Sequence, residues 1–340
     1  MHMKKIIANI ATLQASEKLI FTKEELGVDV GPDEILCETL VSIISPGTEL
    51  AAYRGAPPLR YGVTYPRLVG YCNVARVIRK GSKVTNISVG DRVLTLQSHR
   101  SHFKINSSEI LVNIPSEINS RDAACGYLYH LGYNAILRGN VRLGSTIVVI
   151  GMGVLGLTTV AMAALAGGRV YGVSDYAGAI ERSFEAGARG CFRRRDIEKL
   201  FSELGNERAQ IVVSTTGVWS DWGIALDSAG EQGAIVVLGF PGREDTHITL
   251  NPLDSKTFYA KQLRVIAAGH SPLLPEPKGF LPFNLRDNMQ RIMGWILTGH
   301  LRPSSLISGE FGGLSLQEAY QSLLRRDNAA ITYALTWRDE

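Results

Sequence analysis

The hydrophobic pattern of the chain changes character near residue 120. Before that point, short apolar runs are separated by Gly and Pro, which is typical of strands joined by turns. These runs predict strands over residues 35–44, 73–78 and 92–96. Many short strands with little helical spacing favour a compact β-rich unit or barrel.

From about residue 122, segments with helical spacing alternate with short apolar strands. A helix is predicted over residues 123–137, and the next strand is 146–150 (TIVVI). Later strands are expected at 169–173, 209–214, 234–238 and 263–267, and helices at 155–166, 179–186 and 221–228. Short β-branched strands between helices indicate a parallel sheet covered on both faces.

The C-terminal part leaves this alternation. Residues 270–282 contain four Pro and predict a loop. Helices are predicted over 285–298 and 316–324, and a last strand over 330–335. Earlier in the chain, the three Arg at 193–195 predict a solvent-exposed helix start, with a binding patch as the alternative.

Length and composition indicate a globular protein. The 340 residues correspond to about two domains. Hydrophobic residues make up 45% of the chain and charged residues 20%, which argues against intrinsic disorder. A net charge of +4 is too small to indicate a nucleic-acid partner. No apolar run reaches the length of about 18 residues that predicts a membrane span, so no membrane partner is expected.

The four cysteines are widely spaced and form no C-x-x-C motif: Cys37, Cys72, Cys125 and Cys191. This spacing argues against a disulfide scaffold and a zinc ribbon, and it favours a reducing, cytoplasmic location. The N-terminal segment has no long apolar region and no small-residue cleavage site, so no signal peptide is expected.

A glycine pattern follows the strand at 146–150. Gly151, Gly153 and Gly156 form G-x-G-x-x-G, and an apolar helix is predicted directly afterwards. The first Gly permits a tight turn, the second lets the backbone approach a pyrophosphate, and the third lets the helix pack on the strand. The helix N-terminus then offers N–H groups to phosphate, so we expect a bound dinucleotide rather than a Gly-rich turn without ligand. The residues that complete this expected site are Met152, Val154 and Leu155.

The end of the second strand of this unit separates NAD from NADP. A carboxylate there accepts hydrogen bonds from the ribose and repels a 2′-phosphate. The usual acidic position falls on Ser174, and Asp175 and Tyr176 follow. Ser suits a 2′-phosphate, yet no Lys or Arg follows before Arg182, and Asp175 is able to turn to the ribose. The cofactor is therefore expected to be NAD(P), with a slight lean to NAD and the choice left open.

Small residues also end the later strands. Because ligands bind at the carboxyl ends of parallel strands, these positions are expected to face the cofactor. They are Thr215, Thr216, Gly239, Phe240, Pro241 and Ala268.

Several motifs resemble those of the medium-chain dehydrogenase/reductase superfamily, and the resemblance covers nearly the whole chain. Residues 46–49 (PGTE) are similar to the family's C-G-T-D segment, and residues 66–72 (PRLVGYC) to its P-x-x-x-G-H-E. Residues 89–93 (VGDRV) match its V-G-D-R-V.

The resemblance implies an α/β fold with two domains. A chaperonin-10-like, β-rich catalytic domain would comprise residues 1–128 and 270–340, and a Rossmann domain with a doubly wound parallel sheet would comprise residues 129–269. The resemblance also implies a reaction in the cleft between the domains and a homodimer.

The resemblance breaks at the catalytic metal. Zinc alcohol dehydrogenases of this family hold Zn²⁺ with Cys, His and a further Cys. These positions correspond here to Pro46, Tyr71 and the neighbourhood of Tyr127, and residues 93–114 lack the cysteines of a structural zinc lobe. We therefore predict no zinc. Among zinc-free relatives, the segment around Pro46 and Tyr71 is most similar to bacteriochlorophyllide a dehydrogenase-type members, which does not assign a pigment substrate.

Without a metal, side chains must stabilise charge on the substrate oxygen and supply a proton. Tyr71 is the first candidate, because it takes the place of a metal ligand. Thr48 corresponds to the family's proton-relay hydroxyl. Tyr127 and His130 are three residues apart on a predicted helix, and His is able to shuttle a proton near neutral pH. For all but Thr48, the alternative is packing in the core.

Three further polar residues are expected to have structural roles. His99 and His102 are expected in a loop, and Glu49 is expected to brace the fold.

Together these features predict a zinc-independent oxidoreductase that transfers hydride between nicotinamide and an alcohol or carbonyl compound. A C=C reductase acting on enones or quinones and a non-catalytic cofactor-binding protein are the alternatives. The substrate cannot be read from the sequence, because its pocket depends on the loops around residues 54–65 and 270–284.

Overall fold

The computed structural model describes residues 5–56, 65–239, 241, 250–269, 271–273, 282–325 and 329–338. The chain divides into two compact units. The first unit comprises Met1–Tyr127 and Leu273–Glu340, and the second comprises Leu128–Pro272. The predicted α/β fold class is confirmed, because one unit is built on largely antiparallel sheets and the other on a parallel sheet.

The main sheet of the first unit has seven strands. Its order is β15-β16-β3-β5-β6-β8, and β7 pairs with β3. The bounds are β3 Glu34–Ile43, β5 Asn73–Lys80, β6 Arg92–Thr95, β7 His102–Asn106, β8 Val112–Asn113, β15 Ile307–Gly312 and β16 Thr332–Thr336. All pairs are antiparallel except β15 with β16. The predicted strands at 35–44, 73–78 and 92–96 are β3, β5 and β6.

A second sheet in this unit has the order β2-β1-β4. Its strands are β1 Lys5–Ala15, β2 Lys18–Gly27 and β4 Arg67–Leu68. None of them is among the strands predicted from the sequence. In β2 no side chain is fully buried, so this strand lacks the apolar alternation that marks a strand in the sequence.

The described helices of the first unit are α1 Pro46–Tyr53, α2 Ser120–Ala124, α8 Leu285–Leu297 and α9 Leu316–Arg325. The predicted helix at 123–137 is wrong as one element. It is divided into α2, which the Asn119 side chain caps, and α3 Gly126–Arg138, with Cys125 between them. A Cβ on Gly126 would lie 2.6 Å from Met293 Cε, so glycine here lets α8 pack closely.

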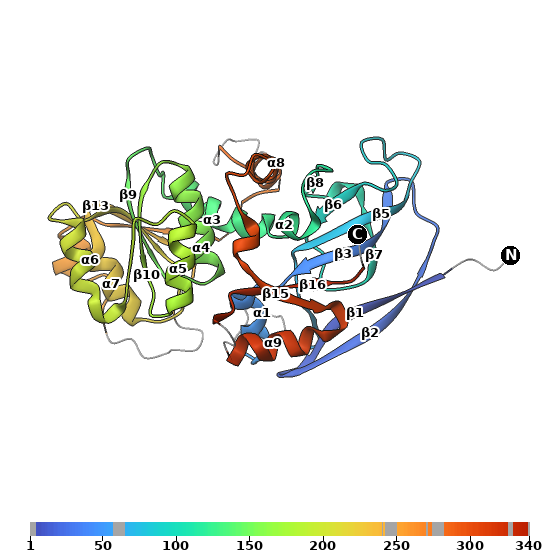
Figure 1. Cartoon of the computed structure of the whole chain (residues 1–340), viewed down its shortest axis with the longest axis horizontal. Helices are drawn as coiled ribbons and strands as arrows, with labels where there is room; N and C mark the ends of the chain where they lie inside the picture. The colour runs from blue at the N-terminus through green and yellow to red at the C-terminus, as the bar shows by residue number, and fades with distance from the viewer. Residues whose placement is uncertain are drawn as a thin grey trace. The chain divides into compact units, whose positions relative to one another are not determined.

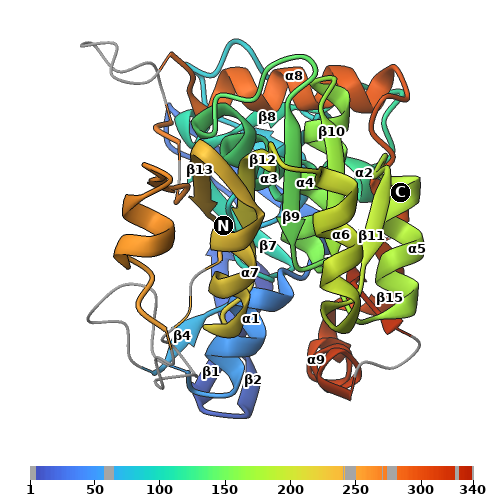
Figure 2. The same cartoon turned by 90° about the vertical axis from the view of Figure 1, so that its left-hand side faces the viewer.

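The second unit is a six-stranded parallel sheet in the order β11-β10-β9-β12-β13-β14. These strands run side by side across Figure 2. Their bounds are β9 Thr146–Ile150, β10 Arg169–Val173, β11 Gly190–Phe192, β12 Ala209–Ser214, β13 Ala229–Val237 and β14 Arg264–Ala267. Counted along the chain this order is 3-2-1-4-5-6, the order of the Rossmann fold.

Helices cover both faces of this parallel sheet. Helices α4 Val154–Leu165 and α5 Ala177–Glu185 lie on one face, and α6 Ile197–Leu204 and α7 Ser220–Ser228 on the other (Figure 1). The core between the sheet and α7 includes Val148, Ile150, Val212, Trp222 and Leu226, all below 9% exposure. Burial on both faces explains why the strands are continuous apolar runs in the sequence.

Most elements of the second unit agree with the sequence prediction. The predicted strands at 146–150, 169–173 and 209–214 are β9, β10 and β12. Strand β13 begins at Ala229 rather than at 234, and β11 and α6 are not predicted at all. Strand β11 has only three residues, all half-buried, so it gives no periodic signal.

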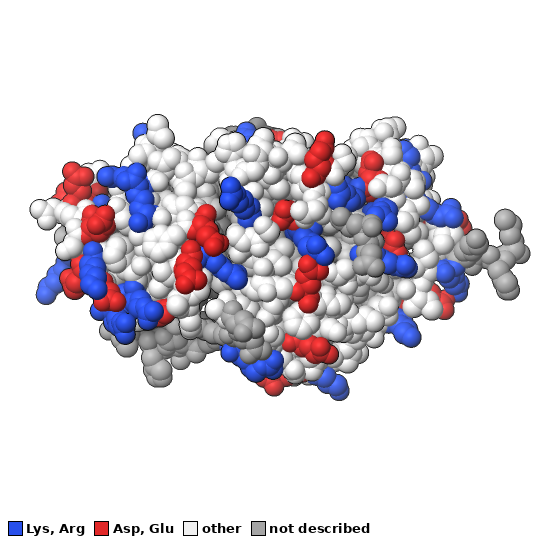
Figure 3. Space-filling model, viewed as in Figure 1, with Lys and Arg blue, Asp and Glu red and all other residues white. Residues whose placement is uncertain are grey.

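In the part of the chain that the structure describes, no helix has the length and apolar character needed to cross a membrane. On the face in Figure 3, positive and negative side chains are interspersed, with no broad patch of one sign.

Candidate functional site

The turn between β9 and α4 has the backbone geometry that two of its glycines predict. Gly151 has a φ of +92°, and a Cβ there would lie 2.5 Å from Thr216 Cγ2. A Cβ on Gly156 would lie 1.7 Å from the carbonyl oxygen of Gly151. Glycine is therefore required at both positions, first for the positive φ and then for the close packing of the helix on the turn.

Gly153 differs from both, because a Cβ there would meet no atom within 4 Å. It is the N-cap residue of α4, a helix of 12 residues, and no side chain caps this terminus. The first N–H groups of a helix have no partner within it and carry partial positive charge. The side chains of Met152 and Val154 are buried at 3% and 7% exposure, so they do not cover the backbone. The backbone at this turn is therefore able to hold a diphosphate. Leu155 is the second residue of α4.

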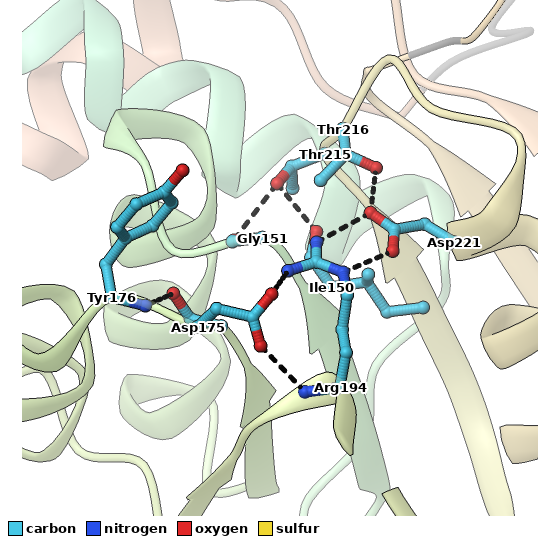
Figure 4. Close-up of polar contacts among 9 residues, drawn as sticks. Ile150, Gly151, Asp175, Tyr176, Arg194, Thr215, Thr216 and Asp221 are labelled. Atoms are coloured by element: carbon cyan, nitrogen blue, oxygen red, sulfur yellow. Dashed lines mark hydrogen bonds and ion pairs between the residues drawn. The ribbon is translucent and has the colours of Figure 1, made fainter. Parts of the chain in front are cut away.

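Thr215 fixes the turn from the neighbouring strand β12. Its Oγ1 donates to the carbonyl oxygen of Ile150 at 2.8 Å and lies 3.1 Å from that of Gly151 (Figure 4). Thr215 thereby joins the ends of β9 and β12, between which the strand order of the sheet reverses. Ligands of open parallel sheets bind at such a reversal.

At the end of β10, Ser174 and Asp175 differ in exposure. Ser174 is 3% exposed, and its Oγ accepts a hydrogen bond from the Tyr176 N–H at 3.3 Å. The Asp175 side chain is 47% exposed. Tyr176 is the N-cap residue of α5 and is 52% exposed. The carboxylate of Asp175, rather than the hydroxyl of Ser174, is therefore the polar group presented at this strand end.

Arg194 lies beside Asp175 and forms a polar cluster with Asp175 and Asp221 that no motif in the sequence indicates. Its Nη1 lies 2.7 Å from Asp175 Oδ2, and its Nε lies 2.7 Å from Asp221 Oδ1 (Figure 4). The prediction of a solvent-exposed helix start is wrong for Arg194, because its side chain is only 30% exposed and is paired with two carboxylates. The partners are 19 and 27 residues away, so no local pattern could reveal them.

The contacts between Asp175, Arg194 and Asp221 favour the charged forms of Asp175 and Arg194. Partial burial favours the neutral form of Asp175, but the N–H and guanidinium of Arg194 outweigh it and lower the pKa of Asp175 below its usual value. Hydrogen bonds to Asp221 raise the pKa of Arg194. Asp175 and Arg194 are therefore both charged at neutral pH.

The last strand ends contribute backbone rather than side chains. A Cβ on Gly239 would lie 2.3 Å from the Thr215 carbonyl oxygen, so glycine lets these two strand ends approach. Ala268 is 1% exposed, and its N–H donates to the Val237 carbonyl at 2.9 Å. Pro241 is half-buried, and Phe240 lies outside the described residues.

In the first unit, Tyr71 lies beside Thr48 and Tyr127. The Tyr71 hydroxyl donates to Ser45 Oγ, and its ring meets that of Tyr127 edge to face at 5.5 Å and 76°. Burial raises the pKa of Tyr71, as do the nearby Cys72 and Glu49, while the hydroxyls of Ser45 and Thr48 act against this rise. Three of the four catalytic candidates from the sequence are thus neighbours, and Tyr71 is a neutral phenol at physiological pH.

The fourth candidate, His130, lies in the second unit on α3. It is 1% exposed, and burial lowers its pKa to about 4. The ring is therefore neutral near pH 7, where a proton shuttle needs to change its charge.

Glu49 is the centre of a buried polar network in the first unit. Its Oε1 accepts the Ser45 N–H at 2.6 Å, and its Oε2 lies 2.8 Å from His99 Nε2 and 2.6 Å from the Tyr320 hydroxyl. The other ring nitrogen of His99 lies 2.8 Å from Ser42 Oγ. These contacts agree with a bracing role for Glu49.

The expectation of a loop is confirmed for His99 and is wrong for His102. His102 begins β7, and its Nε2 lies 3.4 Å from Glu38 Oε1. The backbone of His99 lies between β6 and β7, but its side chain is 0% exposed. A Cβ on Gly70, which has a φ of +89°, would lie 2.6 Å from the His99 ring. Glycine before Tyr71 therefore makes room for this histidine.

The residues present at the family's zinc position do not fit a zinc ion. Pro46 has no donor atom, and the phenols of Tyr71 and Tyr127 are not among the thiolate, imidazole and carboxylate ligands that zinc takes in proteins. Both nitrogens of the nearby His99 and both oxygens of Glu49 are committed to hydrogen bonds. Within the described ranges, no three His, Cys, Asp or Glu side chains gather as a metal-binding group.

Comparisons with known proteins agree with this architecture. A family model described as zinc-binding dehydrogenase matches residues 154–271. An uncharacterized zinc-type alcohol dehydrogenase-like protein of Haemophilus influenzae is 25% identical over 256 residues, which cover 64% of this chain and 71% of that protein.

Solved structures share the fold over almost the full chain. A zinc-binding dehydrogenase of Sinorhizobium meliloti bound to NADP has a TM-score of 0.79 at 18% identity, covering 97% of this chain and 99% of that one. An alcohol dehydrogenase of Escherichia coli complexed with NADH also has a TM-score of 0.79, at 16% identity and the same coverage. At this identity the likeness establishes the fold.

The sheets and the Gly151–Gly156 turn define an α/β protein with a Rossmann-type unit joined to a largely antiparallel one. This architecture, the family model over residues 154–271 and the curated relatives together support the medium-chain dehydrogenase/reductase superfamily.

Proposed function

We propose that this protein is a zinc-independent, NAD(P)-dependent oxidoreductase that interconverts an alcohol and a carbonyl compound. The observation that carries the proposal is the open space at Gly153, at the uncapped N-terminus of α4. A Cβ on Gly151 or Gly156 would collide with other atoms of the protein, whereas a Cβ on Gly153 would meet none within 4 Å. A diphosphate beside the turn accounts for glycine at this third position.

When bound, the nicotinamide supplies or accepts the hydride. The second unit would hold the cofactor through the α4 N-terminus, Asp175 and the ends of β12, β13 and β14. The first unit would hold the small-molecule substrate near Tyr71, Thr48 and Tyr127.

Tyr71 is proposed as the proton donor to the developing alkoxide. Its raised pKa keeps the phenol protonated at neutral pH, so it is able to donate as negative charge builds on the substrate oxygen. Ser45 accepts the Tyr71 hydroxyl in this structure, and its own hydroxyl can reverse to stabilise the phenolate after transfer. The O–H bond of Tyr71 breaks as the O–H bond of the alcohol forms.

Tyr71→Phe tests this role. Oxidation of NADH and NADPH would be followed with a panel of ketones, aldehydes and enones. We expect turnover with carbonyl compounds and a loss of at least tenfold in Tyr71→Phe, about 1.4 kcal/mol in activation free energy. Tyr259→Phe is the matched control, because Tyr259 is 77% exposed.

Two outcomes would contradict the proposal. Turnover with enones alone would indicate C=C reduction, and cofactor binding without turnover would indicate a non-catalytic protein. Metal analysis of the purified protein should give well under one zinc per chain, and stoichiometric zinc would refute the metal-free mechanism.

We further propose a homodimer in a reducing, cytoplasmic location. The four cysteines are free thiols, three of them buried, as expected for a protein that forms no disulfides.

A further inference from the structure

We infer that Arg194, fixed by the buried Asp221, positions the Asp175 carboxylate and thereby makes the second unit select NAD over NADP. This inference rests on the proposed function, because it presupposes a dinucleotide on the Gly151–Gly156 turn. It adds two positioning residues to Asp175 at the end of β10: Arg194, which follows β11, and Asp221, which lies in α7.

The hydrogen bonds of Arg194 link three strand ends at the carboxyl edge of the sheet. Toward α7, its Nε and Nη2 lie 2.7 and 2.8 Å from the two oxygens of Asp221. Toward β10, its N–H lies 2.9 Å from Asp175 Oδ1, and its Nη1 lies 2.7 Å from Oδ2. The Thr216 hydroxyl, at the end of β12, donates to Asp221 Oδ2 at 2.6 Å. Figure 4 shows the guanidinium between the two carboxylates.

The three charged side chains differ in exposure, from the protein interior to the surface. Asp221 is 0% exposed, Arg194 30% and Asp175 47%. A buried carboxylate without a partner is costly, so Asp221 must hold the guanidinium in a forked geometry. The remaining Nη1 and the backbone N–H of Arg194 then face Asp175 from a fixed position. The half-exposed carboxylate is therefore oriented from the protein interior.

A carboxylate oriented in this way favours a ribose over a phosphate. Each oxygen of Asp175 accepts one hydrogen bond from Arg194 and keeps capacity for a ribose hydroxyl. Arg194 cannot serve a 2′-phosphate equally well, because two carboxylates already share its positive charge and the three groups together carry one net negative charge. A phosphate dianion next to this cluster would be repelled.

The neighbouring cations Arg195 and Lys199 are paired with Asp196 rather than with Asp175. Lys199 lies 3.0 Å and Arg195 3.6 Å from Asp196, and both side chains are more than 70% exposed. Arg193 also acts on Asp175 through its positive charge. Arg193→Ala therefore belongs among the tested variants, since NADP binding that depended on it would contradict the inference.

The test measures binding rather than activity. Calorimetric titration of the full chain with NAD⁺ and NADP⁺, and with 5′-AMP and 2′,5′-ADP as ribose probes, gives the ratio of affinities for wild type and variants. We expect wild type to bind NAD⁺ at least tenfold more tightly than NADP⁺. Asp175→Asn should bring this ratio close to one. Arg194→Lys, which keeps the charge but loses the fork, should weaken NAD⁺ binding about tenfold and lower the ratio.

Controls separate this effect from unfolding. Arg195→Lys is the matched control, because Arg195 is 77% exposed in the same run, and its ratio should equal that of wild type. Asp175→Asn leaves the buried pair of Arg194 and Asp221 intact, so it remains informative if Arg194→Lys fails to fold. Preference of wild type for NADP⁺, or an unchanged ratio in folded Asp175→Asn or Arg194→Lys, would overturn the inference alone. Absence of binding by every probe would overturn the proposed function as well.

Discussion

At the scale of single residues, the Glu49 carboxylate is the centre of a buried hydrogen-bond network in the first unit. Three donors reach it, from the Ser45 backbone, His99 and Tyr320, and its side chain is 2% exposed. Tyr320 is 271 residues away in the sequence, so this carboxylate ties the C-terminal helix α9 to α1. Because every donor is buried, losing the charge leaves several groups poorly satisfied.

Glu49→Gln should therefore lower the free energy of unfolding by at least about 1.5 kcal/mol, measured by urea denaturation. Glu25→Gln is the control, because Glu25 pairs with Lys5 at 2.5 Å on the surface and is 62% exposed. A change of the same size in both variants would show that the Glu49 network does not stabilise the fold.

His130 should make stability depend on pH in the acidic range. Its pKa is about 4 in the folded protein and about 6.5 when unfolded, so the unfolded chain binds more protons between these values. The unfolding free energy should then fall as the pH is lowered from 6.5 to 4, by up to about 1.4 kcal/mol per pH unit. Comparing pH series of wild type and His130→Gln isolates this slope. Equal slopes would contradict a buried, neutral His130.

At the scale of elements, the turn between β9 and α4 carries the argument for a dinucleotide. Two of its glycines are needed for the fold and one is not, and the positions can be separated by substitution. Gly153 has a φ of −78°, which alanine adopts without strain, and open space around it. Gly156 lacks this space, because a Cβ there would lie 1.7 Å from the carbonyl oxygen of Gly151.

Gly153→Ala should keep the melting temperature of wild type but weaken dinucleotide binding at least tenfold, since a methyl group would enter the phosphate position. Gly156→Ala should instead lower the melting temperature. Gly294→Ala in α8 is the control, because no atom lies within 4 Å of its added Cβ, and binding should not change. Full binding by Gly153→Ala would refute a diphosphate at this turn.

Strands and helices were predictable from the sequence where burial gives them a clear pattern of apolar residues. β9 is buried throughout, and β10 and β12 have one exposed residue each, because both faces of the parallel sheet are covered. β2 and β11 were missed, because no side chain in either is fully buried.

In the candidate site, local motifs were predictable from the sequence and contacts between distant residues were not. The glycine turn is a local motif and was found. Arg194 and its two partners, Asp175 and Asp221, come from three separate segments of the chain, and Glu49 and Tyr320 are 271 residues apart. Such contacts exist only in the folded chain. The roles assigned to Tyr71, Thr48, Tyr127 and His130 stay predictions.

At the scale of the whole molecule, the end of the parallel sheet offers a surface for the proposed homodimer. β14 is the last strand of the described sheet, and three of its four side chains are exposed. An exposed edge strand is open to pairing with a second copy. Val265 in this strand is 44% exposed.

Light scattering coupled to size-exclusion chromatography should give twice the mass of the chain. Val265→Lys should shift the protein toward the monomer, while Leu143→Lys should not, because Leu143 is 87% exposed but lies before β9, away from this strand. A monomeric wild type, or a Val265→Lys variant that stays dimeric, would contradict association through β14.

The central claim is that a nicotinamide dinucleotide binds the Gly151–Gly156 turn in a protein that works without zinc. Its most direct test is calorimetric titration of chelator-treated protein with NADH. We predict saturable binding of about one NADH per chain, with the same affinity before and after chelation. Absence of heat with NAD⁺, NADH, NADP⁺ and NADPH alike, or binding that disappears when metal is removed, would contradict the account.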